Sequence, residues 1–437
     1  MRKRRRHYVI VYILLWGLML PVSGLKGSDT LLLSRNMSEA RFLQENLLLI
    51  AERLNIEKAE ALLLQERFWP NPTLNIDEVN LWATQSQLGY FGEELPPLWG
   101  EVGRNRQLSV ELEQLIYTAG KRRKRIAVER VATEISRQEF EEVLRELKLE
   151  FRNTLTSLQF LQQQHTLYNQ QRDNINRLIS SFERQHREGH LGMGELVRLQ
   201  ALSLEFSRAQ FDIATGIHEA QRALQSLLNL PPGVVPVLTT DDFLPDTTRL
   251  ENLQAAMLLE VASQNRPDLK MQSLFEEYYR RQYDLARAHR IPDVTLKGSY
   301  DRGGNFMLNF IGAGIAIDLP VFDRNRGNIL HAGHGIRQSE VLLQHKRSEV
   351  NHEVMEAYRN LLLALQFFRG IAPDYEETLH QLMESYTGGL IRRDISMLEY
   401  IDFLHAYTEN ITIIHEGIKE LQERTEALQY VMGTDLQ

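Results

Sequence analysis

Histidine is the residue type through which this sequence could most readily bind a metal ion. The 437-residue chain contains 13 histidines and no cysteine, which excludes thiolate catalysis, disulfides and thiolate metal sites. His331 and His334 are three residues apart near an expected helix start and could share one helix face. No third ligand lies nearby in the sequence, and His352-Glu353 lacks the second histidine of a zinc-binding His-Glu-x-x-His motif. The sequence therefore predicts no metal site and no cofactor.

Other residues with chemical potential have simpler structural explanations. Gly312-Ala313-Gly314 lies inside a strand pattern, where glycine eases close packing, and is not a nucleotide-binding loop. The basic run from Lys121 to Arg125 directly follows a strand and is interpreted as a solvated collar at a membrane boundary. No strained-turn nucleophile motif is present, and a net charge of −8 disfavours general nucleic-acid binding. We therefore expect neither an enzyme nor a nucleic-acid-binding protein.

The N-terminal segment has the three-part pattern of a secretory signal. Basic residues fill Arg2 to Arg6, and a mostly apolar run follows from Val9 to Leu20. This run is shorter than the roughly 20 residues of a membrane-spanning helix, and Val22-Ser23-Gly24 supplies small residues near a cleavage point. Residues 1–24 are therefore predicted to be a cleaved signal, so the mature chain is expected to be exported.

Two parts of the sequence resemble each other, which indicates an internal duplication. Pro70-Asn71-Pro72-Thr73-Leu74 is similar to the segment that starts at Pro292, 222 positions later. The segment that starts at Leu158 matches the one that starts at Leu362, 204 positions later. A constant offset over a long stretch is the signature of a repeat, and the drop in offset places extra residues in the first copy near Leu81 to Arg104.

The duplication predicts the organisation of the chain. Leu230-Pro231-Pro232-Gly233 is a helix stop between the copies. We expect a first repeat at 25–233, a linker or small subdomain at 234–250 and a second repeat at 251–437. Each repeat is predicted to contain, in this order, a helix, a strand, a loop, a strand, a long helix, a break and a second long helix.

The strand segments alternate between apolar and polar or small residues. Leu108, Val110 and Leu112 form one face of the second strand, and Ile311 to Leu319 alternate in the same way in the fourth. One apolar face suits either a lipid-facing β-barrel or an antiparallel sheet packed on a core. Four strands cannot close a barrel, and open edges are not tolerated in lipid. Three copies of the chain would supply twelve strands, although other copy numbers remain open.

The helical segments are unusually long. No proline or glycine occurs from Val128 to Arg187, a stretch that would span about 90 Å as a helix. Apolar residues spaced three, four or seven apart predict coiled-coil packing of this segment with the helix after Gly189-His190-Leu191-Gly192. A corresponding break is expected at Gly388-Gly389 and the residues that follow. Each repeat is therefore expected to contain one helical hairpin.

At this point the sequence resembles the TolC-like outer-membrane efflux proteins. The resemblance is carried by Asn71 to Leu74, by Leu115 to Gly120 with its basic continuation, and by Leu319 to Asp323. The segments at the breaks, Gly189 to Gln200 and Asp394 to Phe403, add to it, and the match covers nearly all of the mature chain. The segment from Asp394 to Glu399 is more similar to the branch of the family that is paired with exporters of heavy metals and other cations.

The resemblance implies a membrane α+β fold. Its members are trimers in which a 12-stranded β-barrel, four strands per chain, continues into a long antiparallel α-helical coiled-coil tunnel across the periplasm. The implied partners are outer-membrane lipid, a periplasmic adaptor and an inner-membrane pump that supplies the energy. Acidic residues after the second tip narrow the entrance in the family, and the matching positions are Glu399 and Asp402, with Glu195 equivalent in the first repeat. Adaptor-docking tips are expected at Gly189, Leu191, Gly192, Gly389, Leu390 and Ile391.

Several alternatives remain open from the sequence. Glu399 and Asp402 could instead pair with Arg392 or Arg393 on a solvated face, and Leu191 and Ile391 could plug the end of the coiled-coil core. The same fold could serve a type I protein secretion system. A different class, a periplasmic coiled-coil adaptor or structural protein with a small β domain, is favoured if the strands face a core instead of lipid. The sequence does not indicate the exported substrate.

Overall fold

The chain forms two compact units, and neither coincides with a predicted repeat. The computed structural model describes residues 29–77, 108–190, 192–239, 246–302 and 309–436, so the predicted signal at 1–24 lies outside the described residues. Unit 1 comprises residues 1–48, 148–252 and 359–427, and unit 2 comprises residues 49–147, 253–358 and 428–437. Each unit draws on both predicted repeats.

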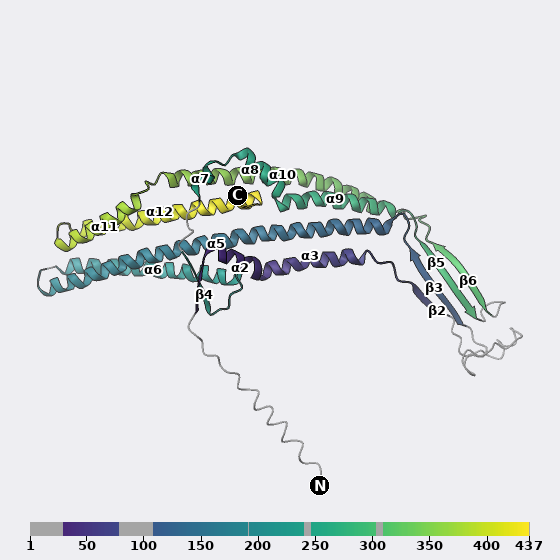
Figure 1. Ribbon diagram of the computed structural model, residues 1–437, viewed down its shortest axis with the longest axis horizontal. Coiled ribbons are helices and arrows are strands. Elements are labelled where there is room, and N and C mark those ends of the chain that lie inside the picture. The colour runs from purple at the N-terminus through teal and green to yellow at the C-terminus, as the bar shows by residue number, and fades with distance from the viewer. Residues whose placement is uncertain (1–28, 78–107, 191, 240–245, 303–308, 437) are drawn as a thin grey trace, which may run out of the picture. The chain divides into compact units, whose positions relative to one another are not determined.

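Unit 2 contains a four-stranded antiparallel sheet with the strand order β2-β3-β5-β6. The strands, which lie side by side in Figure 1, are β2 (Thr73–Asp77), β3 (Leu108–Ile116), β5 (Val294–Arg302) and β6 (Phe310–Ile317). The second and the fourth lie where the alternation predicted them. The central pair, β3 and β5, joins a strand of the first predicted repeat to one of the second, with Leu112 opposite Gly298.

The alternation holds along most of the four strands and gives the sheet two chemically different faces. Cross-strand partners share a face, and one face is apolar, with Leu74, Ile76, Val110, Leu112, Leu296, Tyr300, Ile311, Ile315 and Ile317. The opposite face carries mostly polar, charged and small residues, including Thr73, Asn75, Glu111, Glu113, Lys297, Ser299, Gly312 and Gly314, with Leu115 and Phe310 as apolar exceptions. Ile311 is 83% exposed and Ile315 is 67% exposed, so this chain leaves much of the apolar face uncovered.

Helices make up most of the described chain. They are α2 (Arg35–Glu45), α3 (Leu47–Gln65), α5 (Lys121–Arg187), α6 (Met193–Leu227), α7 (Thr247–Glu251), α8 (Ala255–Asn265), α9 (Pro267–Ala288), α10 (Arg326–Arg369), α11 (Tyr375–Arg392) and α12 (Met397–Met432). Within the described ranges, none is both long and apolar enough to cross a membrane. The 67-residue α5 arises because its sequence lacks helix breakers and repeats an apolar stripe.

The core of unit 1 confirms the periodicity read from the sequence. Its buried cluster draws on α5, α6, α11 and α12, and includes Ile175, Leu178, Phe182, Leu196, Leu199, Phe206, Leu390, Tyr400, Leu404, Tyr407 and Ile411. Stacked Phe42 and Phe151 rings, 4.6 Å apart, attach α2 to α5. Since these side chains stand three, four or seven residues apart, each helix buries one stripe against its neighbours.

The helices differ from the expectation in two places. The second repeat was expected to have one long helix before its break, but residues 370–374 interrupt it and separate α10 from α11. Pro373 lies in this interruption and cannot donate a backbone hydrogen bond. The second break was expected from Gly388-Gly389 to Asp394. Helix α11 runs through both glycines to Arg392, because glycine only weakens a helix whose side is packed on a core, and the break falls at the end of the expected segment.

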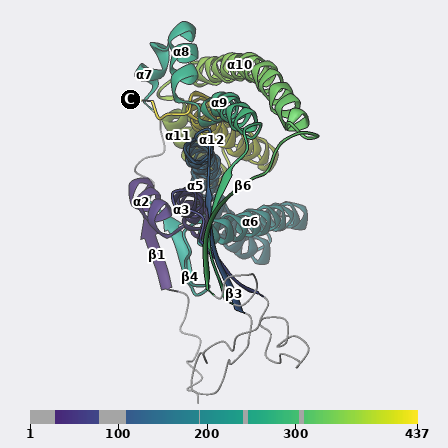
Figure 2. The same ribbon diagram turned by 90° about the vertical axis from the view of Figure 1, so that its right-hand side faces the viewer.

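The segment at 234–250 is more than a linker. It contains β4 (Val234–Leu238), which pairs in parallel with β1 (Asp29–Leu33), as Figure 2 shows, and it ends in the short helix α7. The strand β1 was not predicted from the sequence. Gln221 and Gln225 of α6 donate to the carbonyls of Pro236 and Val234, so side-chain amides bond the open edge of β4.

The two predicted repeats also resemble each other in the helices that precede the sheet strands. Helices α2 and α8 each have 11 residues, and a single extended residue, Asn46 or Arg266, connects each to the next helix. Both connecting side chains are buried. Asn46 donates to the carbonyl of Leu227 at 2.9 Å, and Arg266 donates to the carbonyl of Val431 at 3.4 Å. Leu227 and Val431 are 204 positions apart, so the same contact occurs in both halves with different side chains.

Candidate functional site at the hairpin tips

The first hairpin tip is a helix C-terminus that requires glycine. Gly189 has a φ of +77°, a backbone conformation that side chains with a Cβ rarely adopt. The amide of His190 donates to the carbonyl of Gln185 at 2.9 Å, and the amide of Gly189 donates to the carbonyl of His186 at 3.0 Å. This pair of bonds is a Schellman motif, and it ends α5 and reverses the chain.

The second tip has the same motif without a glycine. Arg393 has a φ of +64°, and it stands 204 positions after Gly189. The amide of Asp394 donates to the carbonyl of Gly389 at 2.9 Å, and the amide of Arg393 donates to the carbonyl of Leu390 at 3.2 Å. A left-handed conformation costs free energy at a non-glycine residue, and such strain often marks a functional position. The sequence predicted a break over this segment but did not identify Arg393 as the turn residue, because the usual glycine is absent there.

The Arg393 side chain joins the two tips of unit 1. Its Nη2 atom donates to the Oε1 atom of Gln185 at 2.9 Å and to the carbonyl of His190 at 3.0 Å. His190 already takes part in the first Schellman motif through its amide. The left-handed backbone at Arg393 therefore coincides with a contact that fixes one helical hairpin against the other.

Glu399 caps the helix that follows the second tip. Its Oε2 atom accepts from the amide of Ser396 at 2.7 Å, and the Oγ atom of Ser396 accepts from the amide of Glu399 at 3.2 Å. This is a capping box, which a Ser-x-x-Glu sequence predicts. The bond from the Ser396 amide holds the pKa of Glu399 below its usual value. At the equivalent place in the first hairpin, Gly192 caps α6 without a side-chain bond to the helix.

The structure separates the three acidic candidates by their surroundings. Glu195, Glu399 and Asp402 all have exposed side chains at the starts of α6 and α12. The alternative was a pairing of Glu399 or Asp402 with Arg392 or Arg393. In the structure Arg392 donates to Asp394 at 2.8 Å, and Arg393 donates to Gln185 and His190. Glu399 is committed to the cap of its own helix, whereas Glu195 and Asp402 face solvent in the isolated chain.

Some of the residues expected to dock an adaptor are exposed, and others are buried in the core. Ile391 is 52% exposed at the end of α11, and Gly189 and Gly192 are exposed at the first tip. Leu390 is 4% exposed and belongs to the core of unit 1, so its expected surface role is wrong. Gly389 is also buried, and a Cβ there would lie 3.5 Å from Ile395. Leu191 lies outside the described residues.

A polar cluster on the sheet is the other group with functional chemistry. The Nζ atom of Lys297 lies 2.7 Å from Glu111 and 2.6 Å from Glu113, so one cation bridges two carboxylates on the polar face. The alternation predicted a polar face but not this bridge between β3 and β5, because the strand pairing was unknown. Among the residues that the structure describes, no group of three or more metal-ligating side chains could hold a metal ion.

Comparison with known proteins assigns the fold to a family. The model of the outer membrane efflux protein family matches residues 40–230 and 258–389. The cobalt-zinc-cadmium resistance protein CzcC of Cupriavidus metallidurans is 27% identical over 213 residues, which cover 46% of this chain and 47% of CzcC. The chain therefore spans about half the length of that relative in the match.

Solved structures share the fold across nearly the whole chain. A structure of CusC has a TM-score of 0.69 at 18% identity, with 91% of this chain and 92% of that chain covered. The CmeC outer-membrane channel of Campylobacter jejuni has a TM-score of 0.71 at 15% identity, with 91% and 85% covered.

The family resolves several of the open alternatives. It consists of outer-membrane efflux channels that extend into the periplasm, and these are passive ducts without enzymatic activity. A protein secretion duct and a periplasmic adaptor are not favoured by these relatives. The chain belongs to the outer membrane efflux protein family.

Proposed function

We propose that this chain is the outer-membrane channel of a tripartite efflux system and works as a homotrimer. The observation that carries the proposal is the four-stranded sheet with one exposed apolar face and one polar face. Both edge strands, β2 and β6, lack a further strand partner among the described residues, and lipid does not tolerate open edges. Three chains close these edges as a 12-stranded barrel with the apolar face towards lipid.

In this arrangement the polar face lines the conduit. The bridge between Lys297, Glu111 and Glu113 then lies in the barrel lumen, where water solvates charges. The long helices of the two predicted repeats, 25–233 and 251–437, continue the conduit as a coiled-coil tunnel through the periplasm, with residues 234–250 connecting them. Residues 1–24 act as the export signal.

The tips are proposed to form the periplasmic entrance. In a trimer, three copies of Asp402, Glu399 and Glu195 surround the axis and attract cations. The relative CzcC is described as a cobalt-zinc-cadmium resistance protein, which favours divalent metal cations as the cargo class. An adaptor docks on the exposed tip surface around Ile391, Gly189, Leu191 and Gly192, and an inner-membrane pump drives transport.

Mass and conductance test the channel and its entrance together. The purified protein is run unheated on a gel and recorded in a planar bilayer; we expect a heat-sensitive species of three chains with pore activity. Asp402→Asn should raise the conductance or weaken block by multivalent cations, because it removes one ring of charge. Glu399→Gln removes a charge while keeping the cap, since glutamine also forms a capping box.

The outcomes separate the parts of this proposal. A water-soluble monomer without conductance would mean that the sheet faces a core, and the channel would be the wrong function. A conducting trimer whose conductance and block are unchanged in Asp402→Asn and Glu399→Gln would refute the acidic entrance but would leave the channel function supported.

Adaptor docking is tested with a charge on the exposed tip. Ile391→Glu should abolish export of the cargo cations by cells while leaving the trimer and its conductance intact, because only the surface of α11 changes. Leu382→Glu is a matched control, since Leu382 is an exposed apolar residue of the same helix, 42% exposed and away from the tip. Export by Ile391→Glu equal to that of wild type would refute docking at this residue.

A further inference from the structure

Within unit 1, helix α12 of the second hairpin packs on helix α5 of the first hairpin. The Nδ1 atom of His415 on α12 lies 3.2 Å from the Nε2 atom of Gln164 on α5. Helix α5 runs towards the tips and α12 runs away from them, so the two helices are antiparallel. Seven residues nearer the tips, Thr408 and Gln171 lie level with each other, and both are buried. These two pairs of residues mark the interface between the two hairpins of one chain.

Helix α6 carries the equivalent of the α12 side of this interface. The constant offset of 204 positions makes Leu204 equivalent to Thr408 and Phe211 equivalent to His415. Leu204 is 73% exposed and Phe211 is 63% exposed, whereas Thr408 is buried. Leu204 and Phe211 are seven residues apart, so they lie on one face of α6. In the described part of a single chain this face of α6 is open to solvent, whereas α5 covers the same face of α12.

The α5 side of the interface also has an equivalent in the second hairpin. Gln164 corresponds to Phe368 at the end of α10, and Gln171 corresponds to Tyr375 at the start of α11. Gln164 and Gln171 are buried, but Phe368 is only half-buried and Tyr375 is exposed. Each chain therefore has two separate faces whose equivalents are packed together inside the chain.

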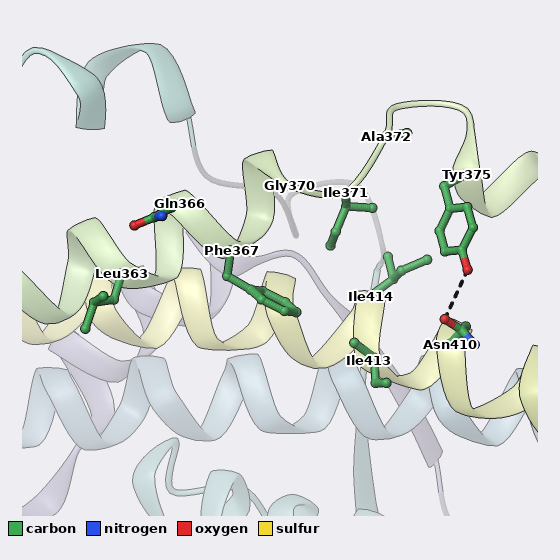
Figure 3. A pocket seen from close by; sticks show the side chains of 10 residues that line it. All are labelled: Leu363, Gln366, Phe367, Gly370, Ile371, Ala372, Tyr375, Asn410, Ile413 and Ile414. Carbon is green, nitrogen blue, oxygen red and sulfur yellow. Dashed lines mark hydrogen bonds between the residues drawn. The ribbon is translucent and has the colours of Figure 1, made fainter.

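A groove lies beside the second of these faces, where residues 370–374 interrupt the second hairpin. It has a volume of about 730 Å³ and is lined mainly by apolar side chains of α10, α12 and the interruption, including Phe367 and Ile371. Figure 3 shows Tyr375 at one end of the groove, where its hydroxyl donates to Asn410 on α12 at 3.1 Å. This bond holds the exposed tyrosine ring at the rim of an apolar surface.

The two uncovered faces differ in chemistry from their covered equivalents. The residues of the interface inside the chain are all polar, and their equivalents are all apolar or aromatic. The polar set is Gln164, Gln171, Thr408 and His415, and the equivalents are, in the same order, Phe368, Tyr375, Leu204 and Phe211. Association between separate chains is driven by the burial of apolar surface, and aromatic residues are enriched in the interfaces that result. The uncovered faces therefore have the composition of a contact between copies of the chain.

We propose that α6 of one copy packs on the end of α10 and the start of α11 of the next copy, with Phe211 against Phe368 and Leu204 against Tyr375. This inference rests on the homotrimer of the proposed function and adds which surfaces meet and in which register. The partner that covers the rim of the groove is thus a second copy of the chain.

Ring closure explains why the chain carries two different faces. Neighbouring subunits of a ring meet through heterologous interfaces, so each subunit needs one face for the copy before it and another for the copy after it. The two hairpins of each chain alternate around the ring. The contact of α12 with α5 inside a chain is then repeated between chains by α6 with α10 and α11.

Cysteine cross-linking tests the contact directly, because the chain contains no cysteine and only introduced thiols can react. The double variants Phe211→Cys/Phe368→Cys and Leu204→Cys/Tyr375→Cys are oxidised in membranes. Heated samples are then run on gels without reductant. We expect covalent dimers and trimers of the chain that return to monomers when reductant is added. A cross-link inside one chain would leave the mass of a monomer.

The same four cysteines in exchanged pairs provide the matched control. Phe211→Cys/Tyr375→Cys and Leu204→Cys/Phe368→Cys place the thiols seven residues out of register, about 10 Å along the helix. A disulfide bridges Cα atoms no more than about 7 Å apart, so the exchanged pairs should cross-link at least about tenfold less. A conducting trimer in which matched and exchanged pairs cross-link equally, or not at all, would overturn this interface and leave the channel function supported. A wild-type protein that forms no trimer would refute both.

Phe211→Ala gives a second readout that needs no cysteine. The Phe211 side chain is exposed in one chain and is buried only between copies, so its removal should lower the temperature at which the trimer dissociates on gels. Met257→Ala is the control, because it removes an exposed apolar side chain from α8, outside the proposed interface. Equal dissociation temperatures for the two variants would contradict the packing of Phe211 on a second copy.

Discussion

Replacing Ile315 with lysine is expected to prevent assembly of the membrane-inserted protein. Ile315 lies on the apolar face of β6, opposite Leu296, and is 67% exposed. If this face contacts lipid, a lysine there costs up to about 2–4 kcal/mol in each copy, the value that applies at the bilayer midplane. Three copies multiply this cost, so the heat-sensitive trimer should be lost from unheated gels of membrane extracts.

The polar face of the same sheet provides the control. Thr73, Glu113, Lys297 and Gly314 are cross-strand partners on the polar face, one residue along β6 from Ile315. Thr73→Lys adds the same charge to a face that already carries Lys297, opposite the acidic Glu113, and the trimer should persist. The reverse result, assembly of Ile315→Lys and failure of Thr73→Lys, would show that the polar face points outward and would refute the barrel.

Arg266→Met is expected to destabilise unit 2 by about 3–5 kcal/mol, because it leaves a buried carboxylate without its main partner. The Arg266 side chain is 2% exposed and donates two bonds to Asp268, at 2.9 and 2.5 Å, and a third to Glu353. Burial alone would favour the neutral acid, but the hydrogen bonds and charge of Arg266 hold the pKa of Asp268 below its usual value. This stabilisation is present at neutral pH and is lost on acidification through the range in which Asp268 is protonated.

Thermal unfolding followed by circular dichroism measures this effect. Arg145 and Lys346 lie 3.8 and 3.7 Å from Asp268 and compensate only part of its charge in Arg266→Met. The double variant Arg266→Met/Asp268→Leu should recover part of the loss, since it removes the unpaired charge. Arg281→Ala is the control, because its pair with Glu277 is exposed and contributes little. A midpoint for Arg266→Met equal to that of Arg281→Ala would contradict the buried-network argument.

The sequence by itself determined the features that follow from local periodicity. Alternation placed β3 and β6, and the spacing of apolar residues predicted the buried stripes of α5 and α6, because those patterns depend only on which side of an element faces the core. The sequence also contains the Ser396-x-x-Glu399 pattern of a capping box. This cap was not predicted because Glu399 was considered for its charge and not for its position in the first turn of a helix.

Tertiary structure decided what depends on contacts between distant segments. The segment from Gly388 to Asp394 predicted a break, but packing on the core extended α11 through both glycines. The turn forms at Arg393, which bonds Gln185 and His190 of the other hairpin. The pairing of β1 with β4 and the Lys297 bridge between β3 and β5 likewise join residues that no local pattern relates. The spacing of apolar residues predicts which side of a helix or strand is buried. The contact partner of a residue depends on where distant segments of the chain lie.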